Sequence, residues 1–342
     1  MFFNNLHKSR NLAIDLGNSN TLLTDQKNVL LSQPSCLVIN KNSNKVEAVG
    51  GVAYEMFEKT PWDLKSIKPL KGGVIADGES AKKMLLAMVN RIQTQRFLTE
   101  GYNYLVSGVP FDTTEVEKRA LRDALEQFNC RNRRLVYEPL AAALGMGLNI
   151  QEPEGKLIVD IGGGITEIAV ISLSGIANFQ SVRVAGDAFD EDIRDHFRRN
   201  YNMAIGLKTA EQIKINVGSV FNLNTGSPAV MKVKGKDLIE GIPVGRMIDE
   251  SEVCSILNKS FSLIEMSIQQ TLELCAPELA ADIYKNGIHV TGGNALLKGL
   301  KERLQSKFRL PVHVDSQALL SVSKGTAQII SNPSKYNSVM FQ

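Results

Sequence analysis

Two stretches of the chain share one pattern of apolar and polar positions. Residues 12 to 23, LAIDLGNSNTLL, and residues 157 to 170, LIVDIGGGITEIAV, each contain an apolar run, a polar turn and a second apolar run. In both, an aspartate is followed by one apolar residue and a glycine, and a threonine stands six positions after the aspartate. Apolar runs on both sides of a glycine-containing turn predict two β-hairpins. Because Asp15 and Asp160 lie so far apart, the repeat predicts two related domains rather than a solenoid.

Strand and helix patterns alternate between these hairpins. Residues 103 to 110 form an apolar run that ends at a proline, which predicts a strand. Residues 113 to 128 have helical spacing, with Thr113 or Thr114 as the N-terminal cap and Glu117 able to complete a capping box. The apolar face predicted for this helix consists of Val116, Ala120, Leu121, Ala124, Leu125 and Phe128.

A third glycine turn lies near the C-terminus. Residues 287 to 304, GIHVTGGNALLKGLKERL, predict a strand, a turn at Gly292 and Gly293, and an amphipathic helix capped by Asn294. The apolar face predicted for that helix consists of Leu296, Leu297, Leu300 and Leu304. Residues 250 to 274 predict a further long helix. This alternation predicts the α/β class, with helices packed on sheets.

Composition narrows the classes of function. The 342 residues suggest about two domains. The 39 basic and 36 acidic residues give a net charge of +3, which is too balanced to indicate a nucleic-acid partner. The four cysteines are scattered without metal-ligand spacing, which suits a reducing cytoplasm. The chain has no run of 18 apolar residues, so we expect no membrane-spanning helix.

The glycine turns carry the candidate chemistry. Glycine lets backbone amides approach a ligand closely, and consecutive amides in a turn form a concavity for anions. Two matched turns, each with an aspartate at its mouth, predict two domains that grip one phosphate-bearing ligand, with both carboxylates facing Mg²⁺. The alternative is an old duplication that has kept no chemistry.

A set of longer segments resembles the motifs of a known protein family. The segments are IDLGNSNT, PLKGGVIAD, VPFDTTEVEKRALRDA, YEPLAAALGMGL, IVDIGGGITEIAVISLSGI, AGDAFDEDI, TAEQIKINVGS and VTGGNALLKGL. Together they resemble the actin-like ATPases, and among these the bacterial actins of the rod-shape-determining MreB family. The resemblance covers nearly the whole chain in the family's order. It implies an α/β fold of the actin-like (ribonuclease H-like) kind, with two domains and the nucleotide in the interdomain cleft.

The resemblance also implies domain boundaries. Domain I would hold residues 1–142 and 313–342, and domain II would hold residues 143–312. The outer subdomain of domain I would cover about 33–77, and that of domain II about 183–244.

ATP and Mg²⁺ are the cofactors that the resemblance implies. Asp15 and Asp160 would contact Mg²⁺, largely through water, and Glu138 would orient the attacking water. For Glu138 the alternative is a charge at a helix N-terminus, stabilised by the helix dipole. The predicted nucleotide-binding residues are Asp15, Gly17, Asn18, Ser19, Asn20, Gly162, Gly163, Gly164, Ile165, Gly186, Asp187, Glu211, Gln212, Ile213, Lys214, Gly292, Gly293, Asn294 and Ala295. Of these, Glu211 and Lys214 would contact ribose and adenine, the alternative being an exposed ion pair.

Two residues depart from the family's pattern. Threonine is usual at the positions of Asn18 and Ile165. The hydroxyl at the second position would help Glu138 to hold the attacking water, and isoleucine has neither donor nor acceptor. Thr166 completes the predicted catalytic set of Glu138, Asp160 and Thr166, although neighbouring side chains in a strand point to opposite faces. We therefore predict intact ATP binding and slowed hydrolysis.

Partners and location also follow from the resemblance. Members of this family form polar protofilaments in antiparallel pairs on the inner membrane surface, with cell-shape and wall-synthesis membrane proteins. The chain is therefore expected in the cytoplasm, peripheral on the inner face of the cell membrane. Candidate lipid anchors are Phe2, Phe3 and Leu6, and separately Phe97 and Leu98, for which packing on the preceding helix is the alternative. The rival functions are a small-molecule kinase of the same superfamily and a filament scaffold that barely hydrolyses ATP.

Overall fold

The computed structural model describes residues 10–96, 101–222 and 228–342. The chain divides into two compact units, unit 1 (Met1–Leu148 with Val322–Gln342) and unit 2 (Asn149–Ser321). The domain boundaries expected from the family resemblance stay a prediction. Within the described ranges, no helix is long and apolar enough to cross a membrane. The candidate anchor residues Phe2, Phe3, Leu6, Phe97 and Leu98 lie outside the described residues.

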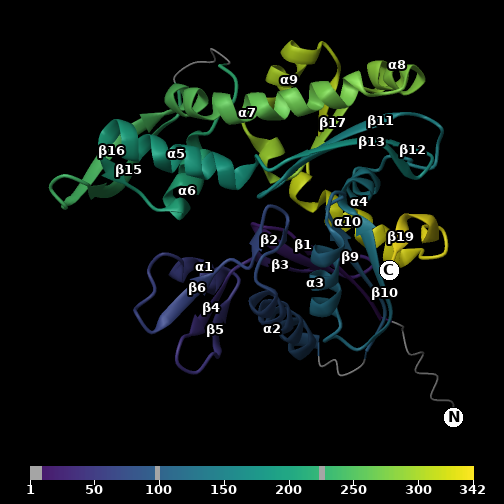
Figure 1. The fold of residues 1–342 in the computed structure, drawn as a ribbon, viewed down its shortest axis with the longest axis horizontal. Coiled ribbons are helices and arrows are strands. Elements are labelled where there is room, and N and C mark those ends of the chain that lie inside the picture. The colour runs from purple at the N-terminus through teal and green to yellow at the C-terminus, as the bar shows by residue number, and fades with distance from the viewer. Residues whose placement is uncertain (1–9, 97–100, 223–227) are drawn as a thin grey trace. The chain divides into compact units, whose positions relative to one another are not determined.

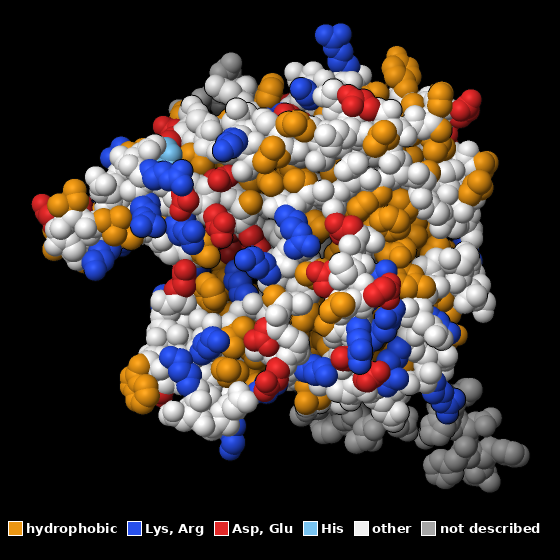
Figure 2. Space-filling model, in the orientation of Figure 1, with side chains coloured by type: hydrophobic (Ala, Val, Ile, Leu, Met, Phe, Trp, Pro, Cys, Tyr) orange, Lys and Arg blue, Asp and Glu red, His pale blue; other side chains and the backbone are white. Residues whose placement is uncertain are grey.

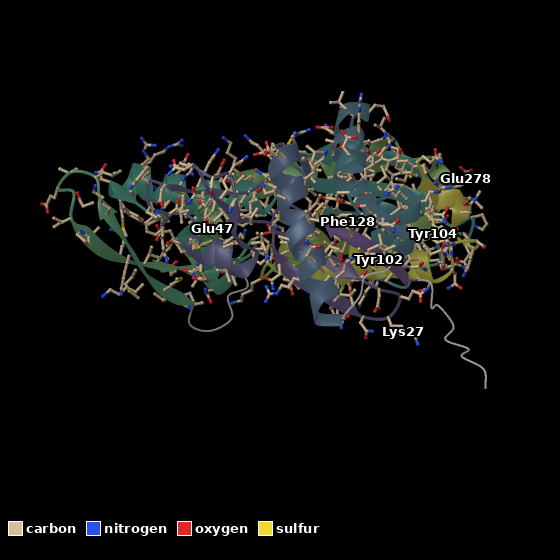
Figure 3. The ribbon with its side chains drawn as sticks, turned by 90° about the horizontal axis from the view of Figure 1, so that it is seen from below. Lys27, Glu47, Tyr102, Tyr104, Phe128 and Glu278 are labelled. Carbon is tan, nitrogen blue, oxygen red and sulfur yellow. The ribbon has the colours of Figure 1, made fainter. Side chains whose placement is uncertain are left out.

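The main sheet of unit 1 has an antiparallel half and a parallel half. In spatial order it contains β19 (Met340–Phe341), β10 (Cys130–Tyr137), β9 (Tyr102–Val109), β1 (Arg10–Leu16), β2 (Asn20–Thr24) and β3 (Val29–Pro34). Strand β1 pairs antiparallel with β2 and parallel with β9, which pairs parallel with β10. The helices α2 (Gly78–Arg96) and α3 (Glu115–Leu125) share a core with this sheet, in which Phe128 is buried and Tyr102 packs at the margin (Figure 1, Figure 3).

Smaller elements complete unit 1. A three-stranded sheet has the order β5 (Val46–Val49), β4 (Leu37–Asn40) and β6 (Leu64–Ile67), with α1 (Gly51–Met56) beside it. The short hairpin of β7 (Leu70–Lys71) and β8 (Val74–Ile75) follows. Helix α4 (Glu138–Gly145) begins directly after β10, and the C-terminal part contains α10 (Ser321–Ser331) and the 3₁₀ helix η3 (Asn337–Val339).

The main sheet of unit 2 repeats the strand directions of unit 1. Its order is β13 (Gly175–Val182), β12 (Thr166–Ser172), β11 (Lys156–Ile161), β17 (Ile288–Thr291) and β18 (Val312–Val314). Strand β11 pairs antiparallel with β12 and parallel with β17, which pairs parallel with β18. The series β3, β2, β1, β9, β10 therefore corresponds to β13, β12, β11, β17, β18, and the two related domains predicted from the hairpin repeat are visible in the sheets.

Helices surround the sheets of unit 2. They are α5 (Gly186–Tyr201), α6 (Leu207–Val217), α7 (Glu250–Glu273), α8 (Pro277–Asn286) and α9 (Leu300–Phe308), with the 3₁₀ helices η1 (Gly293–Leu296) and η2 (Ala318–Leu320). Figure 1 shows α5 and α6 beside a second sheet of β14 (Met203–Ala204), β15 (Val230–Asp237) and β16 (Pro243–Asp249). The core is built around Phe189, Phe197 and Phe261, which are fully buried. Figure 2 shows basic and acidic side chains interspersed over the visible face, in keeping with the near-balanced charge.

The structure confirms most predicted elements and corrects two. Thr114 caps α3, and its capping box with Glu117 is formed. Val116 was predicted on the apolar face of that helix, but its side chain is 79% exposed. The helix predicted from Asn294 is also wrong, because only a 3₁₀ turn follows Gly292 and α9 begins at Leu300. The physical reason is that the Asn294 side chain does not cap a helix but donates to the Gly162 carbonyl at 2.6 Å.

Candidate functional site

The two glycine turns are closed by the same hydrogen bond. The Gly17 amide donates to the Asn20 carbonyl at 3.1 Å, and the Gly162 amide donates to the Ile165 carbonyl at 3.0 Å. The register also matches, because Asp15 pairs with Leu22 in one hairpin and Asp160 with Glu167 in the other. Both predicted hairpins are confirmed, and each places its aspartate one residue before the end of a strand.

Side chains support the first turn, which belongs to unit 1. The Ser35 hydroxyl donates to the Gly17 carbonyl at 2.5 Å, and the Ser35 amide donates to the Ser19 carbonyl at 2.9 Å. The side-chain oxygen of Asn18 accepts from the Gly73 amide at 2.8 Å, and Asn18 is only 5% exposed. Asn18 therefore ties this turn to the β7–β8 hairpin.

Glu138 lies on the same side of unit 1 as this turn. It is the first residue of α4, where the helix dipole favours a negative charge. A pocket brings Glu138 together with Leu16, which precedes the turn, and Gly73, which bonds to it. Gly108 makes room for the carboxylate, since a Cβ atom there would lie 3.1 Å from Glu138 Cγ. The position fits both interpretations of Glu138, as a catalytic group and as a helix-terminal charge.

Backbone groups support the second turn, which belongs to unit 2. The first amides of α5 point into the turn: Gly186 donates to the Gly162 carbonyl at 3.2 Å, and Asp187 donates to the Gly163 carbonyl at 2.7 Å. Within the described part of the chain, no group accepts a hydrogen bond from the amides of Gly163 and Gly164. With its carbonyls held by the helix, the turn can offer these amides to an anion.

Asp160 lies at the mouth of the second turn. The residue as a whole is partly exposed, but its carboxyl is buried, and this burial raises its pKa to about 6. Gly292 closes the other side with φ +85, and a Cβ atom there would lie 2.4 Å from Asp160 Oδ1. A carboxylate that burial penalises in this way is stabilised by a nearby cation.

The single carboxylate at each turn is a donor of the kind that Mg²⁺ uses. In the part of the chain that the structure describes, no group of three or more His, Cys, Asp and Glu residues could hold a metal ion. Each turn offers one aspartate, Asp15 or Asp160. Mg²⁺ keeps several waters and binds through one or two carboxylates and substrate phosphates, so these residues fit it.

Lys214 is not part of an exposed ion pair. It is 8% exposed, and its ammonium lies 2.9 Å from Asp190 Oδ1 and donates to the Gly186 carbonyl at 3.1 Å. Asn294 reaches the same turn from η1. Of the other residues predicted around Lys214, Ile213 is fully buried in the core of unit 2 and Gln212 is exposed.

Thr166 is turned away from the candidate site. It is fully buried, and its hydroxyl donates to the Val184 carbonyl at 2.7 Å. The structure therefore argues against the predicted catalytic role of Thr166, because strand alternation sends its side chain to the other face. Its neighbour Ile165 is 6% exposed, and the isoleucine side chain has no polar group to offer at the turn.

Sequence reasoning missed four residues that hold the candidate site in place. Ser35, Gly73 and Gly108 support the first turn and Glu138, and Asp190 supports Lys214. Asp190 carried the clearest signal, because it stands four positions after Gly186 and so shares a helix face with it. The other three lie in separate segments, and only the folded chain brings them together.

The fold has a well-matched solved relative. The crystal structure of MreB5 of Spiroplasma citri bound to AMPPNP superposes with a TM-score of 0.90 at 34% identity, covering 97% of this chain and 99% of that chain. With its two related sheets and paired glycine hairpins, the chain is an actin-like protein.

Sequence comparison narrows this class to a family. The family model described as MreB/Mbl protein matches residues 9–338. The cell shape-determining protein Mbl of Bacillus subtilis (strain 168) is 37% identical over 328 residues, which cover 96% of this chain and 97% of that protein. The cell shape-determining protein MreB of Escherichia coli (strain K12) is 39% identical over 322 residues, covering 93% and 92%. The chain belongs to the MreB/Mbl family.

Proposed function

We propose that this protein is an ATP-binding bacterial actin that polymerises into membrane-associated filaments and organises cell-wall synthesis to set cell shape. The observation that carries the proposal is the pair of glycine turns with one closing hydrogen bond and one aspartate each. The names of its relatives, which are cell shape-determining proteins, support the cellular role. The AMPPNP bound to the related MreB5 supports the ligand class.

Each residue of the site has a proposed task. The amides of Gly17 to Asn20 and of Gly162 to Gly164 hold the β- and γ-phosphates. Asp15 and Asp160 would hold Mg²⁺, which would neutralise phosphate charge when bound. Glu138 orients the attacking water. Phosphoryl transfer depends mainly on such positioning and charge stabilisation.

The remaining predicted residues serve the nucleoside. Lys214 and Glu211 contact ribose and adenine, and the turn of Gly292, Gly293, Asn294 and Ala295 lies against the base. The burial of Lys214 and its link to Gly186 support a site role rather than a surface ion pair. Gly186 and Asp187 act through the turn, since their amides hold its carbonyls.

Hydrolysis is proposed to be slow. Ile165 stands where a hydroxyl would help Glu138 to hold the attacking water, and Thr166 does not replace it because its hydroxyl is committed to Val184. A filament scaffold that barely hydrolyses ATP is the extreme form of this proposal. The small-molecule kinase is not favoured, because relatives that match nearly the whole chain have cell-shape names.

Titration calorimetry with ATP and ADP, with and without Mg²⁺, tests the nucleotide proposal. We expect binding that Mg²⁺ strengthens, and a loss of at least about tenfold in affinity for Asp15→Asn and for Asp160→Asn, as for lost charge-assisted contacts. Wild-type protein that binds neither nucleotide contradicts the proposal. Consumption of ATP only with an added acceptor would favour the kinase.

Membrane association is proposed to depend on the N-terminal apolar residues. Replacing Phe2 and Phe3 by serine removes two aromatic side chains from a short amphipathic segment, so co-sedimentation with anionic vesicles should weaken. Trp62→Ser is a matched control, because Trp62 is 80% exposed and also aromatic but is not part of the proposed anchor. Equal binding by wild type and the double serine variant excludes this anchor.

A further inference from the structure

A buried ion pair stands behind the second glycine turn. Asp190 on α5 is 7% exposed and Lys214 on α6 is 8% exposed. Their Oδ1 and Nζ atoms lie 2.9 Å apart. Removing two charges from water is unfavourable, and a buried pair often adds little net stability. Net stability is therefore a weak reason for this pair, and the alternative is that one member positions the charge of the other.

The ammonium of Lys214 has a second partner at the turn. It donates to the Gly186 carbonyl at 3.1 Å, and the Gly186 amide in turn donates to the Gly162 carbonyl. Asn294 donates to the same carbonyl. A Cβ atom at Gly186 would lie 3.2 Å from Lys214 Nζ and 2.7 Å from Asn294 Nδ2, which shows how closely these groups converge.

The ammonium keeps one donor for a ligand. A lysine ammonium has three N–H groups. Among the described residues its two partners are Asp190 and the Gly186 carbonyl. The third N–H group is left for a ligand, and the ammonium is linked to the second turn through Gly186, whose amide donates to the Gly162 carbonyl.

We infer that Asp190 is a positioning residue that holds the Lys214 ammonium against Gly186 so that it can contact a nucleotide bound at the second turn. The inference rests on the proposed nucleotide binding. Asp190 itself touches no ligand and acts only through Lys214.

The charge state of Asp190 depends on its burial and on Lys214, whose Nζ atom lies 2.9 Å from Asp190 Oδ1. Burial is the largest influence and raises the pKa of Asp190, the charge and hydrogen bond of Lys214 lower it, and the charges of Glu211 and Asp187 raise it; together they bring the pKa to about 7. Lys214 and Glu211 belong to α6, and Asp187 belongs to the same helix as Asp190. The carboxyl is therefore largely charged at pH 8 and largely neutral at pH 6, where it no longer attracts Lys214.

The test compares ADP affinity of the full-length wild type and Asp190→Asn at pH 8 and pH 6. Asparagine keeps the shape and removes the charge. Because both proteins are titrated with ADP under the same conditions, the ratio of their affinities reports the effect of the change at residue 190. We expect wild type to bind about tenfold more tightly at pH 8, a typical value for a contact to a charged group, with the ratio falling toward one at pH 6. In a Lys214→Met background, Asp190→Asn should have no further effect.

A second buried pair provides the matched control. Glu265 and Arg303 are 8% and 9% exposed, with Oε1 and Nε 2.7 Å apart, and they join α7 and α9. Glu265→Gln should leave ADP affinity unchanged at both pH values. This control separates a general loss of buried charge from a loss at Lys214.

Three outcomes overturn the inference. They are a ratio near one at pH 8, a ratio that does not change with pH, and an undiminished effect of Asp190→Asn in the Lys214→Met background. If Asp190→Asn does not fold, the ratio of wild type to Lys214→Met decides, and a ratio that stays constant between pH 8 and pH 6 overturns the inference. Wild type that binds no ADP contradicts the proposed function itself.

Discussion

The glycine turns of unit 1 and unit 2 share a frame but differ in what holds them. Both are closed by an amide-to-carbonyl bond of nearly equal length, 3.1 Å at Gly17 and 3.0 Å at Gly162. In unit 1 the further support comes mainly from the side chains of Ser35 and Asn18, with the Ser35 amide as a backbone donor. In unit 2 it comes mainly from the first backbone amides of α5, and the Asn294 side chain adds a donor to the Gly162 carbonyl.

This comparison shows which features of the repeated hairpin are the same in both units and which differ. The strand register and the closing bond set where the aspartate and the amides lie, and they are the same in both units. Most of the supporting partners donate to carbonyls of the turn, which any donor can do, and Asn18 instead accepts from the Gly73 amide. The second turn, held by a helix end and by the close approach of Gly292, should therefore tolerate backbone changes least.

The largest expected effect is that of Gly292→Ala. Alanine would need φ +85, and its Cβ would lie 2.4 Å from both Asp160 Oδ1 and the Ile161 carbonyl oxygen, so backbone must move. We expect a loss of several kcal/mol, roughly 10 °C or more in the unfolding temperature of unit 2. Thermal denaturation followed by circular dichroism measures it. Gly78→Ala is the control, because nothing lies within 4 Å of a Cβ there, and an equal shift for both variants contradicts the close packing at Gly292.

An intermediate effect is expected for Asp160→Asn without nucleotide. Burial raises the pKa of Asp160 from 3.8 to about 6, so the folded state binds this proton more tightly than the unfolded state. The associated stability is present below pH 3.8 and is lost as the pH rises through 6. Asparagine carries no charge, so the variant should unfold a few degrees above wild type at pH 8, with a smaller gain at pH 5.

The same thermal scans, run at both pH values, measure the Asp160 effect. Asp15→Asn is the comparison from the other turn. An Asp160→Asn variant that is less stable than wild type at pH 8 would contradict the view that burial of the charged carboxylate destabilises the folded protein until a cation binds.

The smallest expected effect is on the rate of phosphate release, and it distinguishes two neighbouring side chains of the second hairpin, Ile165 and Thr166. Ile165→Thr should raise the rate of phosphate release by about tenfold, because it restores a group that orients the attacking water. Thr166→Val is the matched control: it removes the hydroxyl bound to Val184, so it should lower stability by about 1–2 kcal/mol and leave the rate unchanged. Rates are measured by phosphate release at saturating ATP. An unchanged rate of phosphate release for Ile165→Thr would contradict the proposal that Ile165 slows hydrolysis.

The sequence predicted the repeated frame well because that frame is local. Aspartate, glycine and threonine at fixed spacing between apolar runs determine a hairpin, and both hairpins formed with the same register. The capping box at Thr114 was predictable for the same reason. The roles predicted for Glu138 and Lys214 came from the resemblance of family motifs and not from residue spacing.

What the sequence did not reveal depends on contacts between distant segments. Asn294 looked like a helix cap, but the nearby Gly162 carbonyl takes its amide, so η1 and α9 replace one helix. The Thr166 hydroxyl looked available until the fold placed Val184 beside it. The pairing of Asp190 with Lys214 joins two helices, and no spacing rule relates these residues.

The most direct test of the central claim is high-speed sedimentation of the full-length protein with ATP, ADP or no nucleotide, with phosphate release followed in the same samples. We predict pelleting that requires ATP and Mg²⁺, with phosphate released slowly from the pelleted protein. Protein that stays in the supernatant under every condition, including with anionic vesicles present, would contradict the proposal that it is an ATP-dependent filament-forming actin.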